Sequence, residues 1–238
     1  KFGISACSAA TNGHVDCFGI DTWGVDFGLL DENGSLIESP RCYRDATVEE
    51  MLAAWQILPK REMFEHTGIA AMNFNTVYQL FRRVRESDSA LQRAKTLLLM
   101  PDLLGYLLTG EKKSEYTNVT TTNLYSAAAQ NWDFDLVRKL GIPEEIFTSI
   151  DRAGTLRGRL LPGVAAELGV SQIPFAAVGT HDTASAVAAI PGEGSFAFCS
   201  SGTWSLFGIE TNSPLLGDSI YQANFSNEGT VQGGFRPL

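Results

Sequence analysis

The sequence predicts an α/β fold, because short apolar runs with the length of strands alternate with longer segments that carry helical periodicity. The apolar run at 173–178 ends in a polar turn at 179–183, and a helix of small residues is expected at 184–190. Open α/β sheets bind ligands at the carboxyl ends of their strands. The turn at 179–183 is therefore the first candidate for a functional site.

The N-terminal part of the chain is predicted to contain strands. Apolar runs at 15–20 and 25–30 flank the turn at 21–24. The second run leads to Asn33-Gly34, a pair favoured in tight hairpins because both positions tolerate positive φ. The sheet is expected to continue through residues 35–37.

From residue 47 to about 141 the periodicity is helical, and apolar side chains at helical spacing predict stripes that face the core. One stripe consists of Val77, Leu80, Phe81 and Val84. Pro101 suits the first turn of a helix that Gly110 ends, and Asp133 is placed to cap a helix that Gly141 ends. The only linker-like stretch is the Thr/Asn cluster at 117–123.

Strands are predicted again near the C-terminus. Apolar runs at 195–199 and 206–210 flank a turn at 200–205, and a Pro/Gly-rich stretch precedes the first run. This change of pattern predicts a domain boundary near residue 191. The chain is expected to divide into a domain at 1–190 and the start of a second domain at 191–238.

The composition is that of an ordinary globular chain. Of the 238 residues, 44% are hydrophobic and 19% are charged, which argues against disorder and against a fibrous repeat. The formal net charge of −9 repels a phosphate backbone, so nucleic acid is not an expected partner. No apolar run approaches the roughly 20 residues of a membrane-spanning helix, so no membrane association is expected.

The four cysteines have no CxxC spacing and no paired histidines nearby, which gives little support to a zinc site. No metal-ligating residue is predicted in this chain. The pattern fits a reduced, cytoplasmic protein. The chain opens with Lys1 rather than methionine and closes at Leu238 after a glycine-rich stretch, so a fragment of a longer protein is expected.

Asp182 is the strongest catalytic candidate. The strand, turn and helix pattern places it at or next to a helix N-terminus, where free N–H groups and the helix dipole favour an ionised carboxylate. Such a carboxylate at the end of a strand is able to accept a proton from a substrate hydroxyl as that oxygen attacks phosphorus. The alternative role, a simple helix cap, is equally consistent with the local pattern.

His181 lies next to Asp182, and with Ser185 it invites comparison with a hydrolase triad. The sequence gives this alternative little support, because no G-x-S-x-G nucleophile turn is present. His181 is better explained as a hydrogen-bond partner for a ligand or for a loop carbonyl.

Trp23 and Gly24 form a second candidate position at the end of a predicted strand. A tryptophan face stacks on the C–H surface of a sugar, and a glycine lets a ligand approach the backbone. A core tryptophan beside a bulged turn explains the same residues without a ligand.

A third candidate lies between the last two predicted strands, where Ser200, Ser201, Gly202 and Thr203 form a hydroxyl-rich turn. Turns of this kind offer backbone N–H groups to phosphate, although many Ser-Gly turns bind no ligand. No Walker lysine motif and no G-x-G-x-x-G dinucleotide motif is present, so any nucleotide would bind in another architecture.

Taken together, these segments resemble the rhamnulokinases of the FGGY carbohydrate kinase family. The resemblance is carried by Gly19–Asp31, which contains Asp-Thr-Trp-Gly-Val-Asp-Phe, and by Tyr43–Asp45, Gly179–Ser185 and Ser200–Ser205. The order and spacing match throughout, and weaker similarity at 104–110 and 153–156 extends over nearly the whole chain.

The resemblance implies an actin-like, ribonuclease H-like fold with two domains, of which this chain holds mostly the N-terminal sugar-binding domain and the first strands of the second. It implies binding of a sugar and of ATP with Mg²⁺, and conversion of L-rhamnulose to L-rhamnulose 1-phosphate in L-rhamnose catabolism. By position, Asp182 matches the catalytic base. The sugar-binding matches are Gly24, His181 and Thr183, with Trp23 beside them, and Thr203 matches a contact to the nucleotide phosphates.

Two departures from the family pattern concern the ends of the chain. The family's N-terminal phosphate-binding loop is absent before Lys1, and most of the nucleotide domain would follow Leu238. The chain alone is therefore expected to be inactive. Two alternatives stay open: a related kinase for another ketose, such as L-fuculose or xylulose, and a non-catalytic sugar-binding module on the kinase fold.

Overall fold

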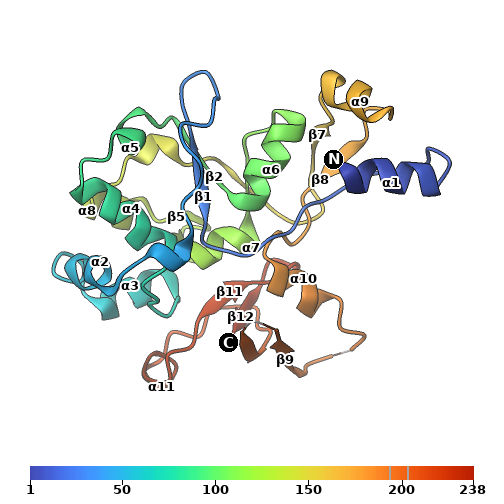
Figure 1. Ribbon diagram of the computed structural model, residues 1–238. Helices are drawn as coiled ribbons and strands as arrows, with labels where there is room; N and C mark the ends of the chain where they lie inside the picture. The colour runs from blue at the N-terminus through green and yellow to red at the C-terminus, as the bar shows by residue number, and fades with distance from the viewer. Residues whose placement is uncertain (193, 203) are drawn as a thin grey trace.

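The structure, a computed structural model, describes residues 1–192, 194–202 and 204–238. At its centre, β1 (Phe27–Leu30) pairs in antiparallel register with β2 (Thr96–Leu99), and every side chain of both strands is buried. Figure 1 shows this pair among the helices of the N-terminal part. The predicted hairpin is also confirmed, because Gly34 has a φ of 79° and Leu36 forms a bridge back to Leu30.

Helices cover both faces of the β1–β2 pair. Phe27, Leu29, Leu97 and Leu99 belong to the main core, while Leu30 and Leu98 pack with Leu103 of the helix that follows β2. The helices that contribute residues to these two core clusters are α2 (Val48–Ala54), α3 (Lys60–Thr67), α4 (Thr76–Arg85), α5 (Ser89–Arg93), α6 (Met100–Thr109) and α8 (Phe134–Lys139). Full burial of each such leucine stabilises the fold by roughly 2 kcal/mol.

The helix ends follow the predicted signals. Pro101 lies in the first turn of α6, and Gly110 ends that helix with a φ of 82°. The carboxylate of Asp133 accepts the N–H of Leu136 at 2.9 Å as the cap of α8, and Gly141 has a φ of 69° just beyond. The predicted stripe at 77–84 is buried against the core, with Val84 partly exposed.

Strand β2 corrects one prediction, because it lies inside the region 47–141 that was expected to be helical. Its last three residues, Leu97–Leu99, are buried and apolar on both faces, and they continue without a break into α6. A strand buried on both faces shows no alternation, so periodicity alone does not distinguish it from a helix.

A second group of strands leads to the candidate turn at 179–183. Here β7 (Leu156–Arg159) pairs with β8 (Pro174–Ala176), and α10 (Asp182–Ala188) follows. Residues 15–20, predicted as a strand, run beside β8 with only an isolated parallel bridge between Phe18 and Phe175. Two further helices, α1 (Phe2–Ala10) and α9 (Pro162–Leu168), lie next to each other beyond β8 (Figure 1).

The C-terminal segment forms two hairpins. β9 (Ala197–Ser201) pairs with β10 (Ser205–Ile209), close to the predicted boundaries, and β11 (Asn227–Gly229) pairs with β12 (Phe235–Pro237). Helix α11 (Asp218–Gln222) lies between the hairpins in the chain. In Figure 1 this segment lies below the β1–β2 pair, on the side where α10 begins.

The remaining short elements surround a buried polar segment. They are the 3₁₀ helices η1 (Tyr43–Asp45), η2 (Thr120–Thr122) and η3 (Glu144–Ile146), the helix α7 (Tyr116–Val119), and the strands β3 (Ser114–Glu115), β4 (Tyr125–Ser126), β5 (Asn131–Trp132) and β6 (Ile150–Asp151). The Thr/Asn cluster at 117–123, whose composition is linker-like, is completely buried within this group. No helix in the described ranges is long and apolar enough to cross a membrane.

The contact between α6 and β8 allows a test of this packing. A methyl group added at Gly105 would lie 2.6 Å from the ring of Phe175, which is buried, whereas one added at Gly163 of α9 would meet nothing within 4 Å. We expect Gly105→Ala to destabilise the protein by about 1–3 kcal/mol through overpacking. Gly163→Ala, the control, should stabilise it by up to about 1 kcal/mol, because alanine is the better helix former.

Urea unfolding of both variants measures the difference. Equal effects of the two substitutions would contradict the close packing of α6 on β8.

Candidate active site

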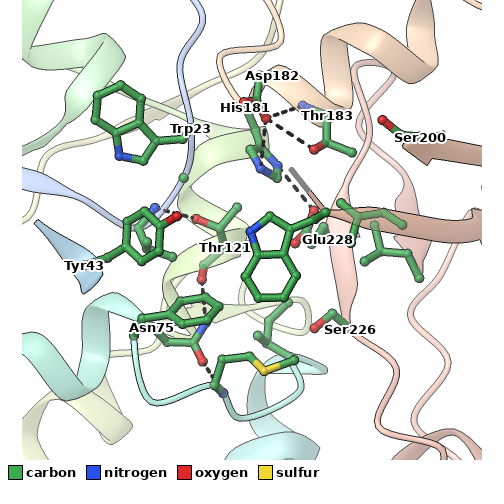
Figure 2. A pocket seen from close by; sticks show the side chains of 18 of the residues that line it. Trp23, Tyr43, Asn75, Thr121, His181, Asp182, Thr183, Ser200, Ser226 and Glu228 are labelled. Carbon is green, nitrogen blue, oxygen red and sulfur yellow. Dashed lines mark hydrogen bonds and ion pairs between the residues drawn. The ribbon is translucent and has the colours of Figure 1, made fainter. Parts of the chain in front are cut away.

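A cavity of about 560 Å³ lies between the N-terminal part of the chain and the C-terminal hairpins. Its lining includes Trp23 and Gly24 from the turn at 21–24, and His181, Asp182 and Thr183 from the turn at 179–183. Figure 2 shows Asp182 and Thr183 at one end of the cavity and Asn75 at the other. The structure thus brings together all the described residues that the sequence singled out for sugar binding and catalysis.

The two turns meet through backbone pairing. The N–H of Thr22 donates to the carbonyl of Thr180, and the N–H of Asp182 donates to the carbonyl of Thr22, both at 2.9 Å. This parallel bridge is the reason that segments about 160 residues apart share one cavity, as expected for the carboxyl ends of neighbouring strands.

A buried carboxylate fixes the loop before Asp182. One oxygen of Glu115 accepts the N–H of Thr180 at 3.0 Å and its hydroxyl at 2.8 Å, and it also accepts the N–H and hydroxyl of Thr117. Glu115 is fully buried, and its other oxygen has no hydrogen bond from a described residue. A buried carboxylate that loses its donors costs free energy. The loop therefore stays where Thr180 is able to donate to Glu115.

Three threonine hydroxyls of the buried segment α7–η2 hold the three sides of the cavity. Thr117 accepts the N–H of His181 at 3.1 Å, Thr121 accepts that of Val25 at 3.2 Å, and Thr120 accepts that of Gly229 at 2.7 Å. Each hydroxyl directs its own proton within the segment, to the Glu115 carboxylate or to a carbonyl three residues earlier. The lone pairs of the three hydroxyl oxygens are therefore free to accept backbone N–H groups from other segments of the chain.

The backbone at Gly24 and Val25 is unusually constrained. A Cβ at Gly24 would lie 2.7 Å from the hydroxyl oxygen of Thr121, so only glycine fits there without a shift. Val25 has a φ of 67°, which costs a β-branched residue roughly 1–3 kcal/mol. The carbonyl of Val25 accepts hydrogen bonds from Thr76 at 2.7 Å and from Gln79 at 3.2 Å, and these hold the conformation.

Asp182 is the first residue of α10, and its side chain is 56% exposed toward the cavity. Its Oδ1 accepts the N–H of Thr183 at 2.6 Å and the hydroxyl of Thr183 at 3.2 Å. No described residue donates a hydrogen bond to Oδ2. The N-cap position belongs to His181, which makes no capping hydrogen bond with its side chain, so Asp182 satisfies one helix N–H without being the cap residue.

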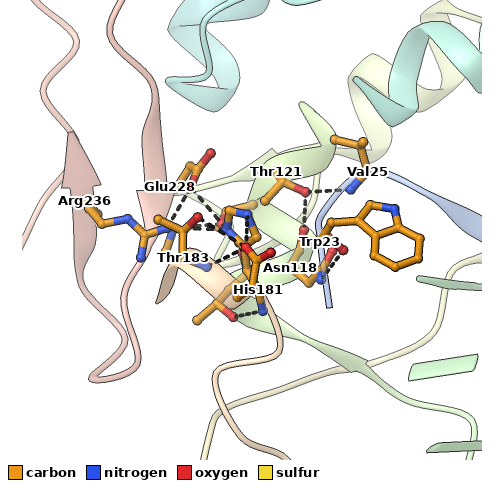
Figure 3. A network of polar contacts seen from close by, with 12 residues as sticks. Trp23, Val25, Asn118, Thr121, His181, Thr183, Glu228 and Arg236 are labelled. Atoms are coloured by element: carbon orange, nitrogen blue, oxygen red, sulfur yellow. Dashed lines mark hydrogen bonds and ion pairs between the residues drawn. The ribbon is translucent and has the colours of Figure 1, made fainter. Parts of the chain in front are cut away.

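His181 is nearly buried and lies between two carboxylates. Its Nδ1 is 3.2 Å from Oε2 of Glu228, and its Nε2 is 3.5 Å from Oδ1 of Asp182. Glu228 also accepts from Nη2 of Arg236 at 2.7 Å, and Arg236 is fully buried (Figure 3). Burial alone would raise the pKa of Glu228, but the attraction of His181 and Arg236 outweighs it and lowers that pKa to about 2.

Glu228 and Arg236 were missed by the sequence analysis. They lie on paired strands, β11 and β12, opposite each other in the register. The chain has 27 acidic residues, and nothing local separates Glu228 from the others. Glu228 reaches His181 only because β11 packs against α7 and η2, which are distant in the sequence.

Trp23 is half exposed at the edge of the cavity, and its indole N–H donates to Asp26 at 2.9 Å. Burial raises the pKa of the Asp26 carboxyl, while the hydrogen bond from Trp23 opposes this.

An aromatic wall that the sequence did not indicate lines another side of the cavity. In it, the ring of Phe74 lies 5.4 Å from that of Tyr43 and 5.9 Å from that of Trp204.

Thr203, the predicted nucleotide contact, lies outside the described residues. Ser200 and Gly202 beside it line the cavity. The N–H of Gly202 donates to the carbonyl of Trp204 at 2.8 Å, so this donor closes the hairpin turn. Over the described ranges, no group of three or more His, Cys, Asp or Glu side chains is arranged to hold a metal ion.

The hydrolase alternative finds no support in the geometry. The hydroxyl of Ser185 donates to the carbonyl of Gly179 at 2.5 Å. A nucleophilic serine would instead direct its proton to the imidazole of His181.

The model of the N-terminal domain of the FGGY family of carbohydrate kinases matches residues 4–189. The chain belongs to the FGGY family of carbohydrate kinases.

Two curated relatives of this FGGY chain are rhamnulokinases. That of Bacteroides thetaiotaomicron is 44% identical over 226 residues, which is 94% of this chain and 47% of the relative. That of Oceanobacillus iheyensis is 39% identical over 233 residues, which is 97% of this chain and 49% of the relative. The chain spans about half the length of the curated relatives it matches.

Solved FGGY-type kinases share the fold at low identity. A xylulose kinase from Lactobacillus acidophilus superposes with a TM-score of 0.85 at 13% identity and covers 98% of this chain and 48% of its own. A Plasmodium falciparum glycerol kinase solved with ADP gives a TM-score of 0.79 at 15% identity, covering 98% of this chain and 48% of its own. These likenesses confirm the predicted α/β, actin-like sugar kinase fold.

The lowered pKa of Glu228 predicts that the stability of the fold depends on pH through this residue. A carboxylate whose pKa in the folded protein is about 2, below the ordinary 4.5, stabilises the fold above its unfolded pKa and loses this contribution as the pH falls toward 2. We expect Glu228→Gln to lose roughly 3 kcal/mol of stability at neutral pH, and the pH-dependent part of this loss to shrink by more than half at about pH 3.

Urea unfolding at the two pH values measures this change, with the exposed Glu210→Gln as the matched control. A difference between wild type and Glu228→Gln that is the same at both pH values would contradict an ionised Glu228.

Proposed function

We propose that the protein containing this chain phosphorylates a ketose with ATP, converting L-rhamnulose to L-rhamnulose 1-phosphate. The observation that carries the proposal is the half-exposed carboxylate of Asp182 in the cavity of a chain that belongs to the FGGY family. The choice of sugar is supported by two curated rhamnulokinases at 39–44% identity.

Asp182 is proposed as the general base. The attacking hydroxyl oxygen of the sugar forms a bond to the γ-phosphorus of ATP, the bond from that phosphorus to the bridging oxygen breaks, and ADP leaves. The proton of the hydroxyl passes to the carboxylate as the new bond develops. With Oδ1 occupied by Thr183, Oδ2 is the oxygen assigned to accept it.

The residues around Asp182 are proposed to hold the sugar. His181 and Thr183 flank the base and line the cavity, Gly24 lets the sugar approach the backbone, and Trp23 offers an exposed ring face at the rim. Sugars bind through hydroxyl hydrogen bonds together with C–H contacts on aromatic faces, and this lining supplies both.

The nucleotide is proposed to bind on the side of the C-terminal hairpins. Ser200 lines the cavity there, the hydroxyls of Ser201 and Ser205 are 2.9 Å apart, and Thr203 keeps its predicted role as a phosphate contact. The solved glycerol kinase, which shares the fold, was determined with ADP. Mg²⁺ enters the proposal as the ion that accompanies ATP, and no residue of this chain is assigned to it.

A second candidate function is the same reaction on another ketose, such as xylulose or L-fuculose. The fold is shared with a xylulose kinase, and at 13% identity this similarity does not distinguish one ketose from another. A non-catalytic sugar-binding module is favoured less, because binding has little need of the free carboxylate oxygen at Asp182.

Three expectations from the sequence stay predictions. They are the domain boundary near residue 190, the inactivity of the chain alone, and a cytoplasmic location.

Asp182→Asn tests the catalytic role in a protein of the relatives' length that contains this chain. The amide keeps the shape of the side chain and an acceptor for the N–H of Thr183, but it removes the basic oxygen. We expect kcat to fall by about 10²–10⁴-fold with little change in sugar affinity, because the lost interaction belongs to the transition state.

Asp218→Asn is the matched control, since Asp218 is likewise the first residue of a helix, α11, and is exposed. It should leave kcat unchanged. Near-normal kcat in Asp182→Asn would exclude Asp182 as the base.

Substrate comparison tests the sugar assignment in the same protein. Sites that hydrogen-bond to hydroxyls reject analogues that lack a matched hydroxyl far more strongly than apolar sites do. We expect kcat/KM to be highest for L-rhamnulose among L-rhamnulose, L-fuculose, L-ribulose and D-xylulose. A higher value for any of the other three would assign the protein to a different ketose.

A further inference from the structure

The imidazole of His181 is held from two sides, and one side belongs to the C-terminal hairpin. Figure 3 shows Glu228 and Arg236 reaching the ring from β11 and β12. Nδ1 of His181 lies 3.2 Å from Glu228 Oε2 and 3.4 Å from Arg236 Nη2, while Nε2 faces Asp182 at 3.5 Å. The two ring nitrogens therefore have different partners, and the partner of Nδ1 decides what Nε2 is able to do.

We propose that Glu228 is a positioning residue that keeps a proton on Nδ1 of His181 and so presents Nε2 to Asp182 and the cavity. The part of this proposal that concerns catalysis rests on the proposed kinase function, whereas the protonation of Nδ1 does not.

The assignment of the proton follows from the two contacts at Nδ1. A carboxylate oxygen only accepts, so a bare Nδ1 at 3.2 Å from Glu228 would place two lone pairs against each other. Arg236 only donates and would favour the opposite tautomer, but its contact to Nδ1 is longer, at 3.4 Å. The same Nη2 is committed to Glu228 at 2.7 Å. On the other side of the ring, Oδ1 of Asp182 would favour a proton on Nε2, but it is farther away, at 3.5 Å, more exposed, and already accepts from Thr183. The closer and more buried Glu228 carboxylate therefore determines the tautomer.

Both sides of the His181–Glu228 contact are fixed to the same buried segment. The N–H of His181 donates to the hydroxyl of Thr117, and the N–H of Gly229, next to Glu228, donates to the hydroxyl of Thr120. The side chain of Asn227 donates to the carbonyl of Gly68 at 2.8 Å and is fully buried. The imidazole and the carboxylate thus have little freedom to separate, as a positioning contact requires.

The consequence for the site is a defined direction for Nε2. A neutral ring protonated on Nδ1 offers its Nε2 lone pair to a hydroxyl in the cavity, and a charged ring donates from Nε2 to Asp182. In either state the nitrogen that faces the base is set by Glu228, a residue on a different hairpin. This assigns the segment at 227–237 a role in arranging His181 next to Asp182.

The direct test is the tautomer of His181 in the chain itself, with no sugar or nucleotide added. Long-range ¹H–¹⁵N NMR of the labelled chain, recorded with the imidazole neutral, distinguishes Nδ1–H from Nε2–H. The chain has three histidines. His66, whose Nδ1 lies 2.7 Å from Asp133, and the exposed His14 provide internal references, and His181→Gln identifies the third signal.

We expect His181 in the wild type to carry its proton on Nδ1. In Glu228→Ala, the ratio of the two tautomers should shift toward Nε2–H by about tenfold or more, as for the loss of a hydrogen bond to a charged acceptor. Glu210→Ala, which removes an exposed carboxylate of the same segment, should leave the ratio unchanged. An Nε2–H signal for His181 in the wild type would overturn the proposal, and this result does not depend on whether any variant folds.

The catalytic part is tested in a protein of the relatives' length that contains this chain. Glu228→Ala is expected to lower kcat by about tenfold with a smaller change in the KM for the sugar, while Glu210→Ala changes neither. Unchanged kcat in Glu228→Ala would overturn the positioning role. If the wild-type protein phosphorylates no ketose, the proposed function fails, and the NMR result on Nδ1 still stands or falls by itself.

Discussion

The site depends on the buried segment α7–η2, where three threonine hydroxyls accept backbone N–H groups from the three sides of the cavity. Thr117, Thr120 and Thr121 fix the positions of His181, Gly229 and Val25, respectively. Each such hydrogen bond contributes only about 1 kcal/mol net, but a buried N–H left without an acceptor costs more. The segments therefore keep their places because separation would leave buried polar groups unpaired.

Glu115 and Glu228 extend this arrangement with charge. Glu115 gathers four donors from Thr117 and Thr180 at the base of the loop. Glu228 forms a largely buried ion pair with Arg236 and contacts the imidazole of His181. Buried charges add little stability on balance but fix geometry, since a partner that moves away leaves an uncompensated charge. This explains why the centre of the site is polar although it is buried.

The sequence predicted the fold class and most elements, and two features explain where it failed. In β2 (Thr96–Leu99) the three leucines are apolar and buried on both faces, so the strand carries no alternation. Residues 117–123 have the composition of a linker but are buried, because their hydroxyls are satisfied by segments distant in the chain. The candidate residues at 21–24 and 181–183 were found because local turn chemistry marks them, whereas Glu228 and the ring of Trp204 reach the cavity only through long-range packing.

The proposed function requires that a ketose binds in this cavity with one hydroxyl beside Asp182. A crystal structure of a protein containing this chain, with L-rhamnulose bound, tests this most directly. We expect a sugar hydroxyl oxygen at about 3 Å from the Asp182 carboxylate, with His181 and Thr183 in contact with the same sugar. A ketose bound outside the cavity, or bound within it with no oxygen in hydrogen-bond reach of Asp182, would contradict the account.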